Sequence, residues 1–154
     1  MKTQLYNYRS GQQIIPESAC QDVITSIEAI DYSLGSNSIR RFNKDLIENL
    51  QSCGWSDNYS LSVYSKISIT SIRNKIGLCV QTGNVARVYA DILKLQTLYT
   101  DEKINAGILI LPTKDCAALI GKNVANYERF IRELTYIFSK VITIPLLVIS
   151  FHCI

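Results

Sequence analysis

Histidine is almost absent from this sequence of 154 residues, and its cysteines never form a CxxC pair. A single imidazole, that of His152, excludes a metal site built from several histidines. The five cysteines are scattered along the chain: Cys20, Cys53, Cys79, Cys116 and Cys153. An odd number of cysteines without metal-ligand spacing predicts buried free thiols rather than a zinc site or a disulfide framework.

The sequence also has no apolar run of the roughly 18 residues that a membrane-spanning helix requires. The longest candidate is the C-terminal stretch ITIPLLVISF. The N-terminal stretch MKTQLYNYRSGQQ has no apolar core of the kind found in secretory signals. We therefore expect a cytoplasmic protein that has no membrane partner.

The composition is that of a globular chain, with 47% hydrophobic and 19% charged residues. This length predicts a single domain over residues 1–154. The net charge of +3 is too small to indicate nucleic-acid binding by itself. Residues 66–94, however, contain five basic residues and only one acidic residue, Asp91. This basic centre is a hint of contact with nucleic acid.

The spacing of apolar residues predicts helices first and then a pair of strands. Apolar residues recur at intervals of three and four after Pro16 and again between Ser38 and Gly54, which predicts two helices. The stretches YSLSVYSKISIT and KIGLCVQ alternate between apolar and polar residues, which predicts strands. The short polar segment SIRN between them suits a hairpin turn.

The second half of the chain alternates between helix and strand. An amphipathic helix is predicted after Asn84, a buried strand over INAGILILP, and a short helix after Thr113. Another helix is predicted from Asn123 or Asn126, and a last strand over ITIPLLVISF, where Pro145 suggests an edge position or a bulge. This order predicts an α/β fold with a mixed sheet flanked by helices on both faces.

The strand KIGLCVQ presents two different faces. Since side chains alternate along a strand, Ile76, Leu78 and Val80 are predicted to face the core. Cys79 and Gln81 then share the opposite face with Gly77. If the two predicted strands pair as a hairpin, Thr70 lies beside Cys79 and Gln81 on one small, uncharged surface.

Four stretches of the sequence form a recognisable pattern: GLCVQTGNVARVYADILKLQTLY, INAGILILPTK, NVANYERF and ITIPLLVI. Together they resemble the BglII-type restriction endonucleases of the PD-(D/E)XK nuclease superfamily. The resemblance implies a restriction-endonuclease-like mixed sheet flanked by helices. It also implies double-stranded DNA as partner, a homodimer, and Mg²⁺ as the cofactor of cleavage.

The resemblance also implies a position for the metal site. Members of this family carry Asp, Glu and then Gln or Glu at the positions that match Thr70, Cys79 and Gln81 here. Mg²⁺ prefers hard oxygen ligands, usually carboxylates, whereas a thiol is a soft ligand and a threonine hydroxyl is neutral. Both expected carboxylates are therefore missing from this sequence, and the ligands of any metal stay unassigned.

Three hypotheses remain open at this point. A carboxylate from a neighbouring helix, such as Glu28, Asp31 or Asp91, replaces the missing acids, and Gln81 with that carboxylate supports Mg²⁺-dependent hydrolysis of DNA phosphodiester bonds. Alternatively, cleavage is lost and a DNA-binding or protein-interaction module remains. In the third hypothesis Cys79 has acquired its own chemistry, with His152 as the only available base.

The catalytic candidates are therefore Gln81, Cys79, Thr70 and Asp91, and the DNA-binding candidates are Asn84, Arg87, Lys94, Arg73 and Lys75. Structural explanations compete with these roles. Asn84 is a favourable helix cap, and Thr70 is a favourable strand residue. A solvated face of ion pairs explains Arg87, Asp91 and Lys94 on the predicted helix.

Overall fold

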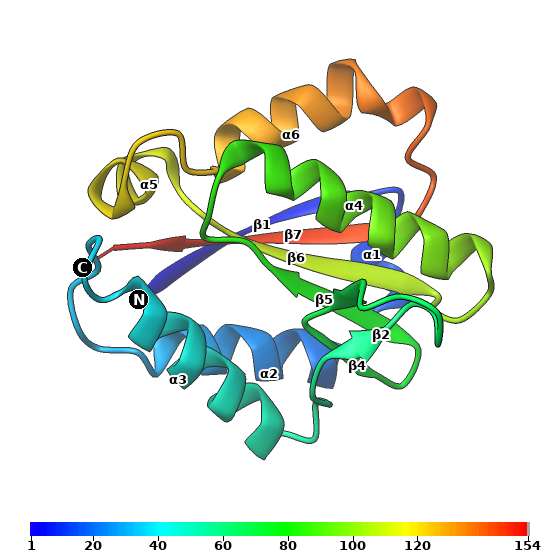
Figure 1. Ribbon diagram of the computed structural model, residues 1–154, viewed down its shortest axis with the longest axis horizontal. Coiled ribbons are helices and arrows are strands. Elements are labelled where there is room, and N and C mark those ends of the chain that lie inside the picture. The colour runs from blue at the N-terminus through cyan, green and yellow to red at the C-terminus, as the bar shows by residue number, and fades with distance from the viewer. Residues whose placement is uncertain (154) are drawn as a thin grey trace.

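The computed structural model describes residues 1–153 and contains a five-stranded mixed sheet with helices on both faces (Figure 1). The sheet order is β1-β7-β6-β5-β4. Its strands are β1 (Lys2–Tyr8), β4 (Ser71–Arg73), β5 (Ile76–Val80), β6 (Ala106–Pro112) and β7 (Leu146–His152). The helices are α1 (Gly11–Ile14), α2 (Glu17–Glu28), α3 (Ile39–Ser52), α4 (Val85–Thr100), α5 (Lys114–Ile120), α6 (Tyr127–Tyr136) and the 3₁₀ helix η1 (Phe138–Lys140). The predicted α/β class is confirmed.

Strands β5, β6 and β7 run parallel, while β4 and β1 are antiparallel to their neighbours at the two edges. Helices α2 and α3 cover one face of this sheet, and α4 and α6 cover the other (Figure 1). No helix among residues 1–153 is long and apolar enough to cross a membrane.

The predicted alternation of β5 is confirmed, although both faces of the strand are buried. Ile76 and Leu78 join the core beneath α2 and α3, whereas Cys79 joins the core beneath α4 and α6. A Cβ atom on Gly77 would lie 2.9 Å from Leu95 Cδ2, so glycine is what allows α4 to pack this closely on β5.

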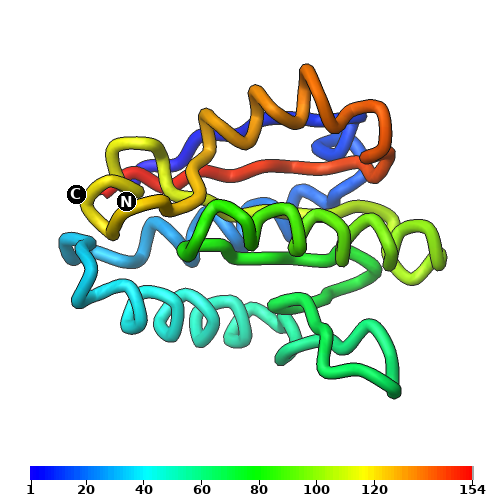
Figure 2. The backbone as a smooth tube through the Cα atoms, turned by 45° about the horizontal axis from the view of Figure 1, so that its top comes forward, coloured from blue at the N-terminus to red at the C-terminus, as the bar shows by residue number. Residues whose placement is uncertain are grey.

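The prediction of one long strand over YSLSVYSKISIT is wrong. Only Tyr59–Ser60 (β2) and Ser68–Ile69 (β3) are strands there, and they form a separate small sheet. Residues 61–67 between them form an irregular loop that projects from the body (Figure 2). Most of this loop is exposed, so its alternating pattern has no core to pack on.

The partner of β5 is instead the short strand β4, which lies within the segment SIRN that was predicted to be a turn. The turn falls at Asn74 and Lys75, which both have positive φ angles, of 47° and 61°. Two such residues are characteristic of a tight type I′ hairpin, whose twist matches that of the flanking strands.

The two ends of the chain also differ from the prediction. The N-terminal stretch forms β1, which the sequence pattern did not reveal because its residues are mostly exposed or half-buried at the sheet edge. Consequently β7 lies between β1 and β6, and the edge position suggested by Pro145 is wrong. Pro145 precedes the first residue of β7, where it removes no donor from the strand itself.

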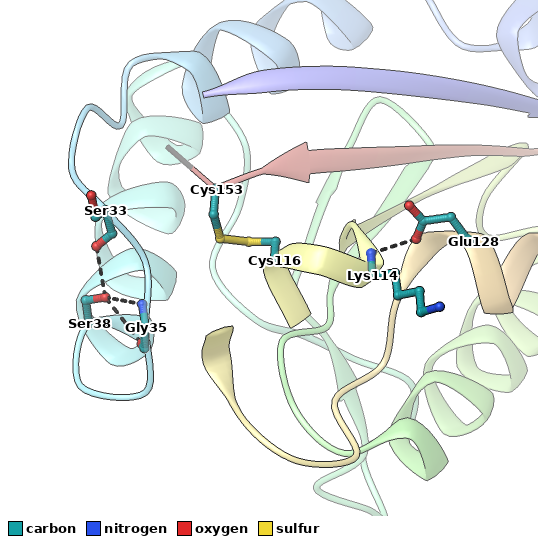
Figure 3. The surroundings of a disulfide bond; sticks show 7 residues. All are labelled: Ser33, Gly35, Ser38, Lys114, Cys116, Glu128 and Cys153. Atoms are coloured by element: carbon teal, nitrogen blue, oxygen red, sulfur yellow. Dashed lines mark hydrogen bonds between the residues drawn. A yellow bond between two sulfur atoms is a disulfide. The ribbon is translucent and has the colours of Figure 1, made fainter. Parts of the chain in front are cut away.

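The prediction that all cysteines are free is wrong for two of them. Cys116 in α5 and Cys153, directly after β7, form a disulfide with their Cα atoms 5.1 Å apart (Figure 3). Their separation of 37 residues gave no signal in the sequence. Disulfides are uncommon in cytosolic proteins, so this bond does not support the cytoplasmic location expected from the sequence.

Candidate functional site

A pocket of about 630 Å³ lies at the carboxyl end of β5, where the chain turns into α4. Ligand sites of open α/β sheets commonly lie at this end of the strands. Residues from α3, β5, α4 and the connecting loop line it: Ile39, Asn43, Val80, Gln81, Thr82, Gly83, Arg87, Ala90, Asp91 and Lys94. The pocket therefore collects several of the candidates that the sequence indicated.

The turn from β5 into α4 is held by side chains of its own residues. Asn84 caps α4, since its Oδ1 accepts a hydrogen bond of 2.8 Å from the Ala86 backbone N–H. This confirms the capping role predicted for Asn84. Gln81 Oε1 likewise accepts a hydrogen bond of 2.9 Å from the Gly83 backbone N–H, which folds the loop back on the Gln81 side chain.

A chain of polar contacts continues from Gln81 into α4. Gln81 Nε2 donates to Asp91 Oδ2 at 2.6 Å, and Lys94 Nζ donates to Asp91 Oδ1 at 2.9 Å. Gln81 and Asp91 are each only 7% exposed. The carboxylate is therefore compensated by a charged partner on one oxygen and an amide donor on the other, as a buried charge requires.

The interpretation of Arg87, Asp91 and Lys94 as one solvated face is wrong for Asp91. Its carboxylate lies in the pocket wall and pairs with Lys94 at i+3. Arg87 is exposed at the pocket and has no ion-pair partner among residues 1–153. Helix α4 thus lines the pocket with the Asp91–Lys94 ion pair and with Arg87, whose charge has no partner among residues 1–153.

Thr70 lies beside Cys79 and Val80 as predicted, although the strand that pairs with β5 is β4 and neither Thr70 nor Cys79 lines the pocket. Thr70 Oγ1 accepts a hydrogen bond of 3.1 Å from the Val80 backbone N–H. Cys79 is 1% exposed, and burial, with a further contribution from the Asp91 charge, raises the pKa of its thiol well above the usual range. Cys79 is therefore a protonated core side chain at neutral pH.

The geometry contradicts the hypothesis of Cys79 chemistry assisted by His152. Cys79 is level with Leu109 on β6, and Leu109 is level with Val148 on β7. His152 lies four residues beyond Val148, which is roughly 13 Å along the strand. A buried thiol whose pKa is raised and that His152 does not reach is not activated as a nucleophile.

The residues of this site do not fit the Mg²⁺ ion that the family resemblance implies. Mg²⁺ requires several hard oxygen ligands, usually including carboxylates. Here the two oxygens of Asp91 accept from Lys94 and Gln81, and the side-chain oxygen of Gln81 accepts from Gly83. Nor do three or more His, Cys, Asp or Glu side chains come together anywhere in residues 1–153.

The other two proposed replacement acids lie elsewhere. Glu28, at the end of α2, accepts a hydrogen bond from Thr3 Oγ1 at 3.3 Å. Asp31 lines a different cavity, together with Tyr32 and Asp45. Among residues 1–153, Asp91 is therefore the single acidic residue that lines the pocket.

Two of the basic candidates also lie away from the pocket. Arg73 forms an ion pair with Asp22 of α2. Lys75 Nζ lies 3.5 Å from the Glu102 carbonyl oxygen and lines another cavity. Both residues are at the amino end of β5, opposite the end that carries Arg87 and Lys94.

Sequence reasoning missed the contribution of α3 to the pocket. Asn43 Nδ2 donates to Thr82 Oγ1 at 2.9 Å, which fixes the loop after Gln81 against α3. A hydrogen bond of 2.9 Å from Ala125 N–H to the Gly83 carbonyl fixes the same loop from the other side. Contacts across 39 and 42 residues leave no local pattern, so only the polarity of these residues was visible in the sequence.

Comparison with known proteins agrees with this architecture. A crystal structure of the restriction endonuclease BglII complexed with a DNA 16-mer is similar at a TM-score of 0.84 and 12% identity, over 99% of this chain and 77% of that one. Free BglII is similar at a TM-score of 0.78 and 12% identity, over 98% of this chain and 79% of that one. No curated protein matches the sequence.

The family comparison is more specific than the similarity of fold. The family described as restriction endonuclease BglII/BglIII matches residues 3–151. This match covers nearly the whole chain and confirms the resemblance seen in the four sequence stretches. The chain belongs to the BglII/BglIII restriction endonuclease family.

Proposed function

We propose that this protein binds double-stranded DNA at the face that carries the Gln81–Asp91–Lys94 pocket, and that it does not hydrolyse DNA with a divalent metal. The observation that carries this proposal is the composition of the pocket. Its single carboxylate, Asp91, is compensated by Lys94, and Thr70 and Cys79 stand where the resemblance places acids. The pocket thus keeps cationic groups but has no ligand set for Mg²⁺.

Two features support DNA as the partner. The chain has the fold of BglII, which is known in complex with a DNA 16-mer. Its pocket carries Arg87 and Lys94 against Asp91 alone, a positive balance that suits phosphate. The DNA-binding candidates at the pocket are therefore Arg87, Lys94 and the neighbouring Asn84, whereas Arg73 and Lys75 belong to another surface.

Binding is measured by fluorescence anisotropy of a labelled duplex over a series of salt concentrations. We expect the dissociation constant to rise steeply with salt, because lysine and arginine contacts to phosphate release counterions. Arg87→Ala should weaken binding, and Lys140→Met, an exposed position outside the pocket, is the matched control. Binding that is absent, or equally strong in Arg87→Ala, would contradict the proposal.

The second candidate function is hydrolysis of DNA supported by Asp91 as a relocated carboxylate. The contact between Gln81 and Asp91 is the observation in its favour. It places a carboxylate next to Gln81, the residue that matches the third site position of the family. Its test is nicking of supercoiled plasmid with Mg²⁺ or Mn²⁺. Nicking that disappears in Asp91→Asn but persists in Cys79→Ala would establish this function.

Homodimer formation and a cytoplasmic location stay predictions. The first rests on the family resemblance, and size-exclusion chromatography with light scattering tests it. The second is an expectation from the sequence alone, and the Cys116–Cys153 disulfide opposes it. Thiol labelling of the protein directly after cell lysis reports whether that disulfide exists in the cell.

A further inference from the structure

We infer that the ammonium group of Lys94 takes the place of the divalent cation in this pocket, so that phosphate is bound directly by Lys94 and Arg87 without metal. This inference rests on the proposed DNA binding and specifies how the pocket achieves it. It follows from the disagreement between the site and the metal that the family resemblance implies.

The oxygen atoms that a cation would need already have donors. Lys94 Nζ lies 2.9 Å from Asp91 Oδ1, and Gln81 Nε2 lies 2.6 Å from Asp91 Oδ2. Gly83 N–H lies 2.9 Å from Gln81 Oε1. The two carboxylate oxygens of Asp91 and the side-chain oxygen of Gln81 therefore all accept hydrogen bonds from the protein itself, and none of them needs a metal ion as partner.

The position of Lys94 suits a fixed cation better than a mobile surface lysine. The Lys94 side chain is 26% exposed and the Asp91 side chain 11%, so their ion pair is shielded from much of the solvent. Lys94 nevertheless lines the pocket, and an ammonium group has three donors, of which one is directed to Asp91. The remaining donors are available to a phosphate oxygen.

The charges of the pocket favour an anion over a metal ion. Asp91 and Lys94 compensate each other, which leaves the charge of the exposed Arg87 in excess. A divalent cation would meet two positive side chains and only one carboxylate. A phosphate group meets two cations, one of which is a guanidinium suited to bidentate contact.

The test is duplex binding by fluorescence anisotropy, in EDTA and in Mg²⁺, for the wild type, Lys94→Met, Lys94→Arg and the control Lys140→Met. We expect the wild type to bind in EDTA at least as tightly as in Mg²⁺, because free Mg²⁺ only competes with the protein for the phosphates. Lys94→Met should weaken binding on the order of tenfold and lower the slope of log K against log salt by about 1, as for the loss of one phosphate contact. Lys94→Arg should retain most of the affinity, and Lys140→Met should bind as the wild type does.

Circular dichroism and thermal melting confirm that each variant is folded, and Lys94→Arg separates loss of charge from loss of packing. Wild-type binding that requires Mg²⁺, or Lys94→Met binding as tightly as the wild type, would overturn this inference while leaving DNA binding established. Absence of any duplex binding by the wild type would overturn the proposed function as well.

A second measurement requires no DNA. Titration of Mn²⁺ into the wild type, followed by electron paramagnetic resonance, should show only the signal of free Mn²⁺, because Lys94 holds the carboxylate. A bound Mn²⁺ signal that Asp91→Asn removes would show that a metal displaces Lys94 and would overturn the inference independently.

Discussion

Strand β5 and helix α4 meet at the same pocket, yet they differ in what their side chains contribute. The strand side is neutral and buried, with Cys79 in the core and Gln81 in the pocket wall. The helix side carries the charges of Arg87, Asp91 and Lys94. The resemblance places the acids on the strands, whereas in this protein the same scaffold carries the charges of the pocket on the helix.

The comparison predicts that changes on the strand alter stability, whereas changes on the helix alter binding. Strand side chains at this position are enclosed by protein, so a new charge or a lost donor has no solvent to compensate it. Exposed helix side chains can be removed with little effect on the fold. The following predictions test this division, beginning with the largest effect.

Cys79→Glu should lower the free energy of unfolding by roughly 3–5 kcal/mol, because it places a carboxyl group beside Asp91 at a position without solvent. Cys79→Ala should have a much smaller effect. Chemical denaturation in the absence of metal measures both. A Cys79→Glu protein as stable as Cys79→Ala would contradict the buried setting of the strand face.

Residue 79 also tests where the resemblance places the metal ligands. In Thr70→Asp/Cys79→Glu the two acids are restored at the positions that the resemblance indicates, so Mn²⁺ should raise the melting temperature of the double variant but not that of the wild type. A double variant whose melting temperature is insensitive to Mn²⁺ would count against this assignment of positions.

Cys153→Ser should lower the free energy of unfolding by about 2–4 kcal/mol, since it removes the covalent link between α5 and the segment after β7. Reduction of the wild type with dithiothreitol should reproduce this loss, and the variant should then be insensitive to the reductant. Cys20→Ser, at a free cysteine, is the matched control. Equal stability of the oxidised and reduced wild type would contradict the prediction.

Gln81→Leu should lower the free energy of unfolding by about 1–3 kcal/mol, because Asp91 Oδ2 and the Gly83 N–H both lose their partner. Urea denaturation measures this loss. Gln21→Leu is the control, because Gln21 lies on the exposed face of α2. Similar stability of Gln81→Leu and Gln21→Leu would show that the polar chain is not stabilising.

Arg87→Ala should change the free energy of unfolding by less than about 0.5 kcal/mol, as for an exposed side chain that forms no ion pair within residues 1–153. It should nevertheless weaken duplex binding several-fold. Denaturation and anisotropy on the same preparation compare the two effects. A large loss of stability without loss of binding would contradict the prediction that changes on the helix affect binding and not stability.

Much of the fold could be predicted because its central strands are strongly apolar. The stretches around Leu78, Ile108 and Val148 identified the three parallel strands, and Asn84 identified the start of α4. The edge strand β1 could not be recognised, since most of its residues are exposed or half-buried and show no regular alternation. Residues 61–67 were wrongly predicted as strand. Their apolar and polar residues alternate, but alternation alone does not supply a partner strand.

The site was predictable as far as local spacing reaches. Alternation placed Cys79 and Gln81 on one face, and helical spacing placed Asp91 near Lys94. The choice of Lys94 rather than Arg87 as the partner of Asp91 depends on side-chain conformation, which spacing does not determine. The contact of Asn43 with Thr82 and the Cys116–Cys153 bond depend on tertiary packing and were invisible in the sequence.

Incubation of supercoiled plasmid with saturating protein in Mg²⁺ or Mn²⁺ shows whether the protein binds DNA without cutting it. One half of each sample is run as the intact complex, and the other half is run after removal of the protein. We expect plasmid that migrates slowly while bound and remains fully supercoiled after the protein is removed. Metal-dependent nicked or linear plasmid that Asp91→Asn abolishes would contradict it.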